Sequence, residues 1–180
     1  KLESAIANQI WQLKHQLKDQ GVAIDKTIDN TWQRVARALA QPETDDTALH
    51  WETEFLGVLD NFSFLPAGRV LAGAGTGRKV TLINTFVMRT IPDSIEGICD
   101  TLKDAAVTMK MGGGIGFDFS TIRPRGTRVA GLDCPAAGPL RAMDVCDAMC
   151  RMLVEGSGRG AMMGALRIDH PDIEDFIDAK

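Results

Sequence analysis

The chain has 180 residues, of which 44% are hydrophobic and 24% charged, in the proportions of an ordinary folded globular protein. A net charge of −4 argues against a nucleic-acid-binding protein, which would need a broad basic surface, whereas a free nucleotide needs only a few local cations. No apolar run reaches the roughly 20 residues of a membrane helix, and the N-terminus lacks the apolar stretch of a signal peptide, so we expect a cytoplasmic protein without a membrane segment.

The first part of the chain is predicted to be helical, because apolar residues recur there at helical spacing. A first helix has its apolar face on Leu2, Ile6, Ile10 and Leu13. A second helix has its apolar face on Ile28, Trp32, Val35, Ala36 and Leu39. A third helix follows a polar break and runs through Leu49, Phe55, Leu56 and Leu59. The glycine-rich residues 64–78 are predicted to form a loop or a short irregular helix.

The second part of the chain alternates between strands and helices. Strands are predicted at residues 80–88, 115–119 and 163–168 from their β-branched and apolar side chains. One helix is predicted to start at Pro92-Asp93-Ser94, with Asp93 and Glu96 at the spacing of a capping box, and another over residues 139–155. This order predicts an α/β unit with parallel or mixed pairing, and its few strands would leave edges for further protein to cover.

Glycines open the second predicted strand in the run Gly112-Gly113-Gly114-Ile115-Gly116. The dinucleotide-binding fingerprint needs a helix after its glycines, and a P-loop ends in Gly-Lys-Ser/Thr, so this run matches neither. Freely oriented backbone N–H groups here suit a phosphate or a ribose, while a tight turn explains the same residues equally well.

Several charged residues near these strands could have either a nucleotide-binding role or an ordinary structural one. Lys110, Arg123, Arg125 and Arg128 flank one strand and suit a triphosphate, although each alone is more simply a solvated surface charge. Asp93 and Ser94 are ordinary helix caps, and a carboxylate there also suits ribose hydroxyls.

The run Asp169-His170-Pro171-Asp172 has the residue types of a metal or acid–base site. A helix start explains it better, with Asp169 or His170 as the cap and Pro171 in the first position. The cysteines are Cys99, Cys134, Cys146 and Cys150. They form no CxxC pair, so reduced cysteines in or near a core are favoured over a redox pair or a metal site.

Spaced segments over essentially the whole chain agree with one pattern: residues 64–71 (FLPAGRVL), 84–88 (NTFVM), 92–98 (PDSIEGI), 112–126, 137–140 (AGPL), 158–163 (GRGAMM) and 170–174 (HPDIE). In this order they resemble the large catalytic chain of ribonucleotide reductase, most closely its adenosylcobalamin-dependent (class II) type. The helical opening, with IWQLKHQ and DNTWQRVARALA, resembles the start of that subtype.

The resemblance implies an α/β fold in two parts. Residues 1–65 would be an N-terminal helical region, and residues 66–180 the first strands and helices of a ten-stranded α/β barrel that is incomplete here. It also implies the radical reduction of a ribonucleotide to a 2′-deoxyribonucleotide. Adenosylcobalamin, bound mostly outside this segment, would generate a cysteine thiyl radical, while the protein binds and orients the reactants.

The resemblance also implies site residues. The substrate nucleotide would meet Asn84, Gly113 and Gly114. A deoxynucleoside triphosphate effector would meet Asp93, Ser94, Ile98, Lys110, Arg123 and the loop residues Arg128, Val129, Ala130 and Gly131. Helices over residues 94–109 and 140–153 would form the interface of a homodimer. No metal ligand is implied.

The chain departs from the family at Thr85, where the family has a redox cysteine. A hydroxyl cannot form a disulfide, so a cysteine pair could not supply electrons at this position. The radical cysteine would lie beyond the chain, so this segment is expected to carry no catalytic residue and to be inactive alone. The rest of the reductase chain or a split partner would complete it. The alternative is a standalone or degenerate relative that only binds nucleotides or regulates a partner.

Overall fold

The computed structural model describes the chain except residues 1, 3, 61, 133, 158, 159 and 180 and the side chains of residues 154–157. The chain divides into two compact units, Lys1–Ile83 and Asn84–Lys180. This division lies later in the chain than the boundary expected between residues 65 and 66. The reason is that Leu71, Ala74 and Leu82 pack in the core of the first unit.

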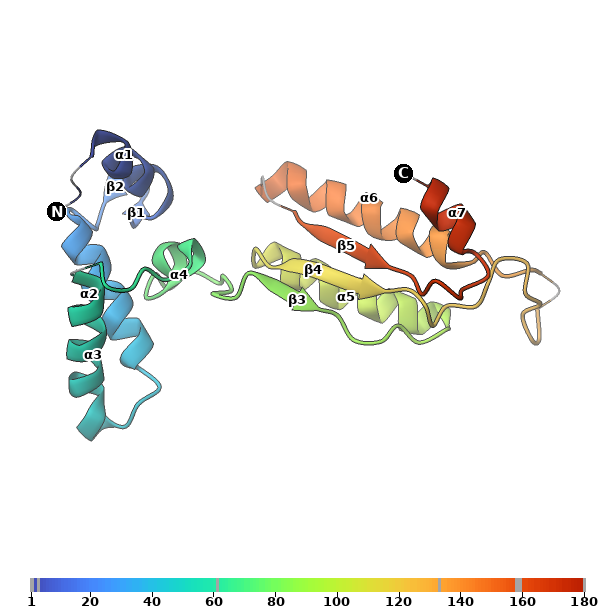
Figure 1. Cartoon of the computed structure of the whole chain (residues 1–180), viewed down its shortest axis with the longest axis horizontal. Coiled ribbons are helices and arrows are strands. Elements are labelled where there is room, and N and C mark those ends of the chain that lie inside the picture. The colour runs from blue at the N-terminus through green and yellow to red at the C-terminus, as the bar shows by residue number, and fades with distance from the viewer. Residues whose placement is uncertain (1, 3, 61, 133, 158–159, 180) are drawn as a thin grey trace. The chain divides into compact units, whose positions relative to one another are not determined.

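The first unit is mainly helical (Figure 1). Its elements are α1 (Ala5–Lys14), β1 (Lys18–Asp19), β2 (Val22–Ala23), α2 (Ile28–Ala40), α3 (Asp45–Asp60) and α4 (Gly68–Gly73). Helices α2 and α3 lie side by side, and α2 buries most of the face predicted for it, with Trp32, Val35 and Ala36 in the core. Leu39, also predicted for this face, is 37% exposed. The short antiparallel hairpin β1–β2 was not predicted. It turns at Gln20 and Gly21, which both have positive φ angles.

The apolar face predicted for the first helix is wrong. Ile6, Ile10 and Leu13 of α1 are 66%, 44% and 73% exposed, and the side chain that α1 buries is Trp11. The indole N–H of Trp11 donates to Thr31 Oγ1 of α2 at 2.9 Å, which satisfies its polar atom inside the core. The large ring therefore takes the place that the periodic aliphatic residues were expected to fill.

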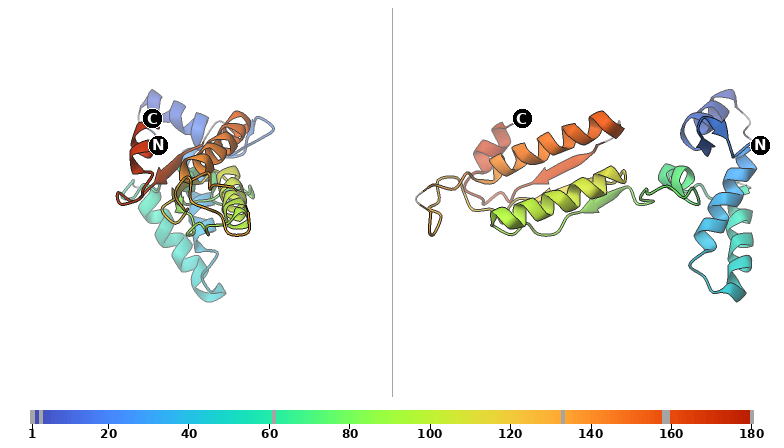
Figure 2. Two further views of the ribbon diagram at one scale, coloured as in Figure 1. Left: turned by 90° about the vertical axis from the view of Figure 1, so that its right-hand side faces the viewer. Right: turned by 180° about the vertical axis from the view of Figure 1, so that it is seen from behind.

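The second unit alternates between parallel strands and helices, as predicted. Its elements are β3 (Thr85–Val87), α5 (Ile95–Lys110), β4 (Gly114–Asp118), α6 (Pro139–Ser157), β5 (Met162–Ala165) and α7 (Ile173–Asp178). The strands form a parallel sheet in the order β3-β4-β5. Helices α5 and α6 pack against each other and cover one face of this sheet (Figure 2).

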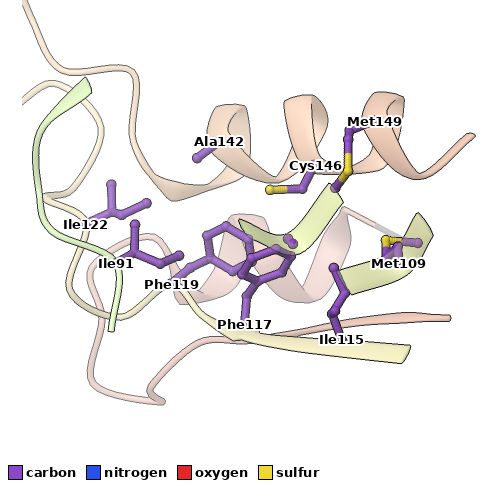
Figure 3. Packing of buried hydrophobic residues seen from close by; sticks show 10 residues of the cluster. Ile91, Met109, Ile115, Phe117, Phe119, Ile122, Ala142, Cys146 and Met149 are labelled. Atoms are coloured by element: carbon purple, nitrogen blue, oxygen red, sulfur yellow. The ribbon is translucent and has the colours of Figure 1, made fainter. Parts of the chain in front are cut away.

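The core of the second unit lies between the sheet and these two helices (Figure 3). Ile115 and Phe117 of β4 meet Met109 of α5 and Cys146 and Met149 of α6 there. Phe117 and Phe119 pack ring against ring, with their centroids 5.5 Å apart. This packing holds the carboxyl ends of the strands in a fixed position below the loops that follow them.

The opposite face of the sheet carries no helix of the second unit. Successive residues of a strand face opposite sides of the sheet. Since Ile115 and Phe117 of β4 face the core, Gly114 and Gly116 lie on the opposite face. In the register of the sheet, Thr85 lies beside Gly114, and Met163 lies beside Gly116. Met163 is 64% exposed, so this face is open. Among the described residues, the sheet has three strands and is not closed.

Two local predictions differ from the structure. The first strand is shorter than expected and covers only Thr85–Val87. The last helix begins at Ile173 with Asp172 as its N-cap rather than Asp169 or His170, because the His170 ring is buried and hydrogen-bonded elsewhere. The glycine-rich sequence of residues 156–160 (GSGRG) predicts a turn, and residues 158–159 of this run lie outside the described residues.

Candidate functional site

Asp93 and Arg123 form an ion pair at the carboxyl end of the sheet. Arg123 Nε donates to Asp93 Oδ2 at 2.7 Å, its NH2 group donates to the Asp93 carbonyl at 3.0 Å, and its backbone N–H donates to Asp93 Oδ1 at 3.2 Å. Both side chains are about one-third exposed (33% and 34%), so the pair borders solvent. Its remaining donors and lone pairs are therefore open to a ligand.

The capping role predicted for Asp93 is wrong. Ser94 is the N-cap of α5, and its Oγ accepts a hydrogen bond from Gly97 N–H at 3.0 Å. Asp93 instead holds Arg123, thirty positions along the chain, which local sequence spacing does not indicate. Gly97 must be small here, because a Cβ on it would lie 2.5 Å from Cβ of Pro92.

The ion pair lines an open cavity of about 410 Å³, within the size range of small-molecule sites. The loops after all three strands contribute to its wall, through Asp93, Ser120, Thr121, Ile122, Arg123, Pro124, Arg167, Asp169, His170 and Pro171. A second ion pair stands in this wall. Arg167 Nε donates to Asp169 Oδ1 at 2.9 Å, and its NH2 group to Asp169 Oδ2 at 2.5 Å. Paired charges and hydroxyls suit a polar, hydroxyl-bearing ligand.

Two carboxylates at this end of the sheet, Asp118 and Asp169, have lowered pKa values. The hydrogen bonds from Arg167 lower the pKa of Asp169. The hydroxyl of Ser120 donates to Asp118 Oδ1 at 2.5 Å and lowers the pKa of Asp118. Ser120 Oγ in turn accepts from the backbone N–H of Arg167 at 2.8 Å, which ties the ends of β4 and β5 together.

The structure does not bring Lys110 to this cavity. Ser94 caps one end of α5 and Lys110 is the last residue at the other, and a helix of 16 residues is about 24 Å long. Lys110 lies instead at the end of the sheet where Gly113 and Gly114 lead into β4. Ile98, in the first turn of α5, is half-buried against the core.

The loop at residues 128–131 follows β4 and forms its own small turn. Arg128 pairs with Pro135 in an isolated antiparallel bridge, and Gly131 has a φ of +79°. Arg128 lines a separate cavity of about 190 Å³ with Cys134 and Pro135. Val129 and Ala130 complete the loop. The loop follows Pro124 closely in the sequence, but none of residues 128–131 lines the 410 Å³ cavity.

The residues predicted to meet a substrate lie at the other end of the sheet. The Asn84 carbonyl accepts from Gly114 N–H at 2.8 Å. A Cβ on Gly114 would lie 3.5 Å from Thr85 Oγ1, so these two residues are neighbours on the helix-free face. Gly113 has a packing role, because a Cβ on it would lie 2.9 Å from the ring of Phe86.

Comparisons with known proteins agree with this fold. The family model for the ribonucleotide reductase barrel domain matches residues 83–180, and that for its all-alpha domain matches residues 2–79. The chain belongs to the ribonucleotide reductase family. A solved relative, the Actinobacillus ureae class Id ribonucleotide reductase alpha subunit, has the same fold, with a TM-score of 0.78 at 20% identity over 97% of this chain and 30% of its own.

Curated relatives are similar over most of this chain. The vitamin B12-dependent ribonucleoside-diphosphate reductase of Mycobacterium tuberculosis is 33% identical over 98% of the chain, and that of Thermoplasma acidophilum 37% over 87%. The ribonucleoside-diphosphate reductase subunit alpha of Helicobacter pylori is 32% identical over 93%. The matches cover 26%, 20% and 21% of these relatives, so the chain spans about a quarter or less of their length.

The resemblance seen in the sequence is thereby confirmed, and so is an incomplete reductase barrel preceded by a helical region. The order of the motifs did not predict that Arg167, Asp169 and His170 line the cavity. The residues beside them in the cavity wall belong to loops that are far away in the sequence. Across the described parts of the chain, no group of three or more His, Cys, Asp or Glu side chains is placed to hold a metal ion. No helix among the described residues has the length and apolarity to cross a membrane.

Proposed function

We propose that this chain is the N-terminal part of a ribonucleotide reductase, which reduces ribonucleotides to 2′-deoxyribonucleotides by radical chemistry. The observation that carries the proposal is the Asp93–Arg123 pair in an open cavity within a family-matched reductase barrel. In this role the segment supplies a deoxynucleotide effector site and one wall of the substrate site.

The effector site would lie in the 410 Å³ cavity. The lone pairs of Asp93 that are not used by Arg123 suit a ribose hydroxyl, and the free donors of the Arg123 guanidinium suit a phosphate oxygen. Ser94 lies next to Asp93 at the start of α5, where the helix dipole also favours an anion. The exposed loop of Arg128 to Gly131 would close over the effector, whereas Lys110 is too far along α5 to contact the same molecule.

The substrate wall would be the helix-free face of the sheet around Asn84 and Gly114. Gly114 and Gly116 leave no side chain of their own on this face, and neighbouring residues bury both in the described chain. Thr85 Oγ1 lies next to Gly114 on the same face of the sheet. A threonine can hydrogen-bond a substrate hydroxyl but cannot store electrons as a disulfide, so electrons would reach the substrate by another route.

Two relatives are named as vitamin B12-dependent, and we propose adenosylcobalamin as the cofactor of the whole reductase. The residues of this segment do not fit it, since the cavities described in the second unit are only about 190, 240 and 410 Å³. These volumes are too small for a corrin with its adenosyl group. The cofactor would be bound by the remainder of the reductase.

A homodimer through α5 and α6 is the third part of the proposal. The outer faces of these helices expose large apolar side chains, namely Ile95 and Val107 of α5 and Val145 and Met152 of α6. Val145 and Met152 are seven residues apart and so lie on one face of α6. Exposed apolar side chains on one face of a helix are typical of a surface that binds another protein.

Calorimetric titration of the chain with dATP, dGTP, dCTP and dTTP tests the effector site. We expect at least one to bind, and the variants Asp93→Asn and Arg123→Gln to weaken binding by at least tenfold, as expected when a charged hydrogen-bonding partner is removed. Arg141→Gln is the matched control, because Arg141 forms an exposed pair with Asp144 outside this cavity. Absence of heat with all four nucleotides would refute the site.

A further inference from the structure

The loop that carries Arg123, residues 120–125, is held by the segments after both neighbouring strands. On the β3 side, Arg123 N–H donates to Asp93 Oδ1 at 3.2 Å. On the β5 side, Arg125 N–H donates to Asp172 Oδ2 at 2.9 Å. The position of the Arg123 guanidinium therefore depends on two segments that are far apart in the sequence.

His170 makes the central contact on the β5 side. Its side chain is buried, with the residue only 7% exposed, and its ring lies between two backbone groups. Asp172 N–H donates to Nδ1 at 3.1 Å, so Nδ1 carries the lone pair. The proton of the neutral ring then resides on Nε2, which donates to the carbonyl of Ile122 at 2.9 Å. Both ring nitrogens are satisfied in this one tautomer.

The carbonyl of Ile122 immediately precedes Arg123 and needs this donor. Ile122 is 5% exposed and packs in the core between the sheet and the helices. A buried carbonyl without a partner is strongly disfavoured, so loss of the donor would favour a turned peptide that reaches another partner or solvent. Such a turn would move the N–H of Arg123, since Ile122 C=O and Arg123 N–H belong to one peptide plane.

We infer that His170 is a positioning residue for the nucleotide site: by holding the Ile122–Arg123 peptide, it aims Arg123 at Asp93 and at the phosphates of a bound deoxynucleoside triphosphate. The ligand in this inference rests on the proposed function. The contact also links the nucleotide site to the segment after β5, because the His170–Ile122 hydrogen bond acts on the peptide that contains the Arg123 N–H.

Two substitutions separate this role from general packing. In His170→Gln, the side-chain amide reaches about as far as Nε2 and can still donate to the Ile122 carbonyl. In His170→Asn, the shorter side chain can accept from Asp172 N–H but cannot reach Ile122. We expect His170→Asn to weaken binding of the tightest of dATP, dGTP, dCTP and dTTP about tenfold, and His170→Gln about threefold or less, in line with one lost hydrogen bond. Equal affinities of the two variants would overturn the inference.

Hydrogen exchange at the Arg123 backbone amide, measured by NMR without nucleotide, gives a second readout. We expect exchange there to be about tenfold faster in His170→Asn than in His170→Gln, with the amides of α2 unchanged in both. Unchanged exchange at Arg123 in His170→Asn would overturn the positioning role whatever the affinities. Faster exchange in a protein that binds none of the nucleotides would refute the proposed effector site while supporting the positioning of Arg123 by His170.

Discussion

Asp25 is a buried carboxylate that is stable only because of its partners. Its side chain is 4% exposed and that of Arg34 is 9% exposed, and they form an ion pair at 2.9 Å. Thr31 Oγ1 donates to Asp25 Oδ2 at 2.8 Å, and Leu17 N–H donates to the same oxygen at 3.2 Å. Arg34 also donates to the carbonyl of Leu71 at 3.0 Å, so one side chain joins α2 to the segment after β2 and to α4.

Removing Arg34 should therefore destabilise the first unit strongly. We expect Arg34→Leu to lower the free energy of unfolding by about 3–5 kcal/mol, because it leaves Asp25 buried without a counter-charge. Urea denaturation followed through the tryptophans measures this. The matched control is Arg37→Leu, whose pair with Glu52 is exposed on the arginine side (73%) and should be worth less than about 1 kcal/mol. Similar losses in both variants would contradict the buried-pair account.

Some residue roles could be predicted from the sequence and others could not. The motif order was sufficient to select Asp93 and Arg123, which the structure joins. Lys110 was grouped with them by resemblance, although its place at the far end of a 16-residue helix keeps it apart. His170 was missed because its partner Ile122 lies 48 positions away, and local spacing favoured a helix cap.

At the scale of elements, helix α6 buries the thiol of Cys146 against the sheet. Burial raises the pKa of this thiol to about 11, because the thiolate is poorly solvated there. Cys99 and Cys134 are exposed in the described structure. The three thiols therefore differ in access to solvent, and Cys146 is a packing residue rather than a redox centre.

Alkylation with iodoacetamide at pH 8 should modify Cys99 and Cys134 rapidly and leave Cys146 protected in the folded chain. The raised pKa also fixes a pH dependence. The protonated Cys146 thiol contributes its full stabilisation below about pH 9, the ordinary pKa of the thiol. This stabilisation is lost as the pH rises towards about 11, because in that interval the thiol ionises readily only in the unfolded chain. Cys146→Ala should remove this part of the loss. Rapid modification of Cys146 at pH 8 would contradict its burial.

The regular periodicity of α2 and the alternation of strands and helices made most elements predictable. The face of α1 was not, because a single indole with a buried hydrogen-bond partner outweighed three aliphatic residues. The β1–β2 hairpin was missed because its strands have two residues each and carry no alternating pattern. Tertiary partners decided both cases, and a short sequence window does not contain them.

At the scale of the whole molecule, the exposed apolar side chains of α5 and α6 predict self-association. We expect the chain to sediment as a dimer at micromolar concentration, and Val145→Asp combined with Met152→Asp to shift it to monomer, because a charge in an apolar interface is costly. Leu49→Asp is the control, since Leu49 is 74% exposed on α3 of the first unit. A chain that is monomeric at all concentrations would contradict this interface.

The central claim is that a deoxynucleotide binds at the carboxyl end of the sheet, between Asp93 and Arg123. Hydrogen–deuterium exchange with and without saturating deoxynucleoside triphosphate tests it most directly. The account predicts slower exchange in residues 91–94 and 120–131 and unchanged exchange in α2 and α3 of the first unit. Binding that protects only residues 84–87 and 112–114, or protects none of the second unit, would contradict it.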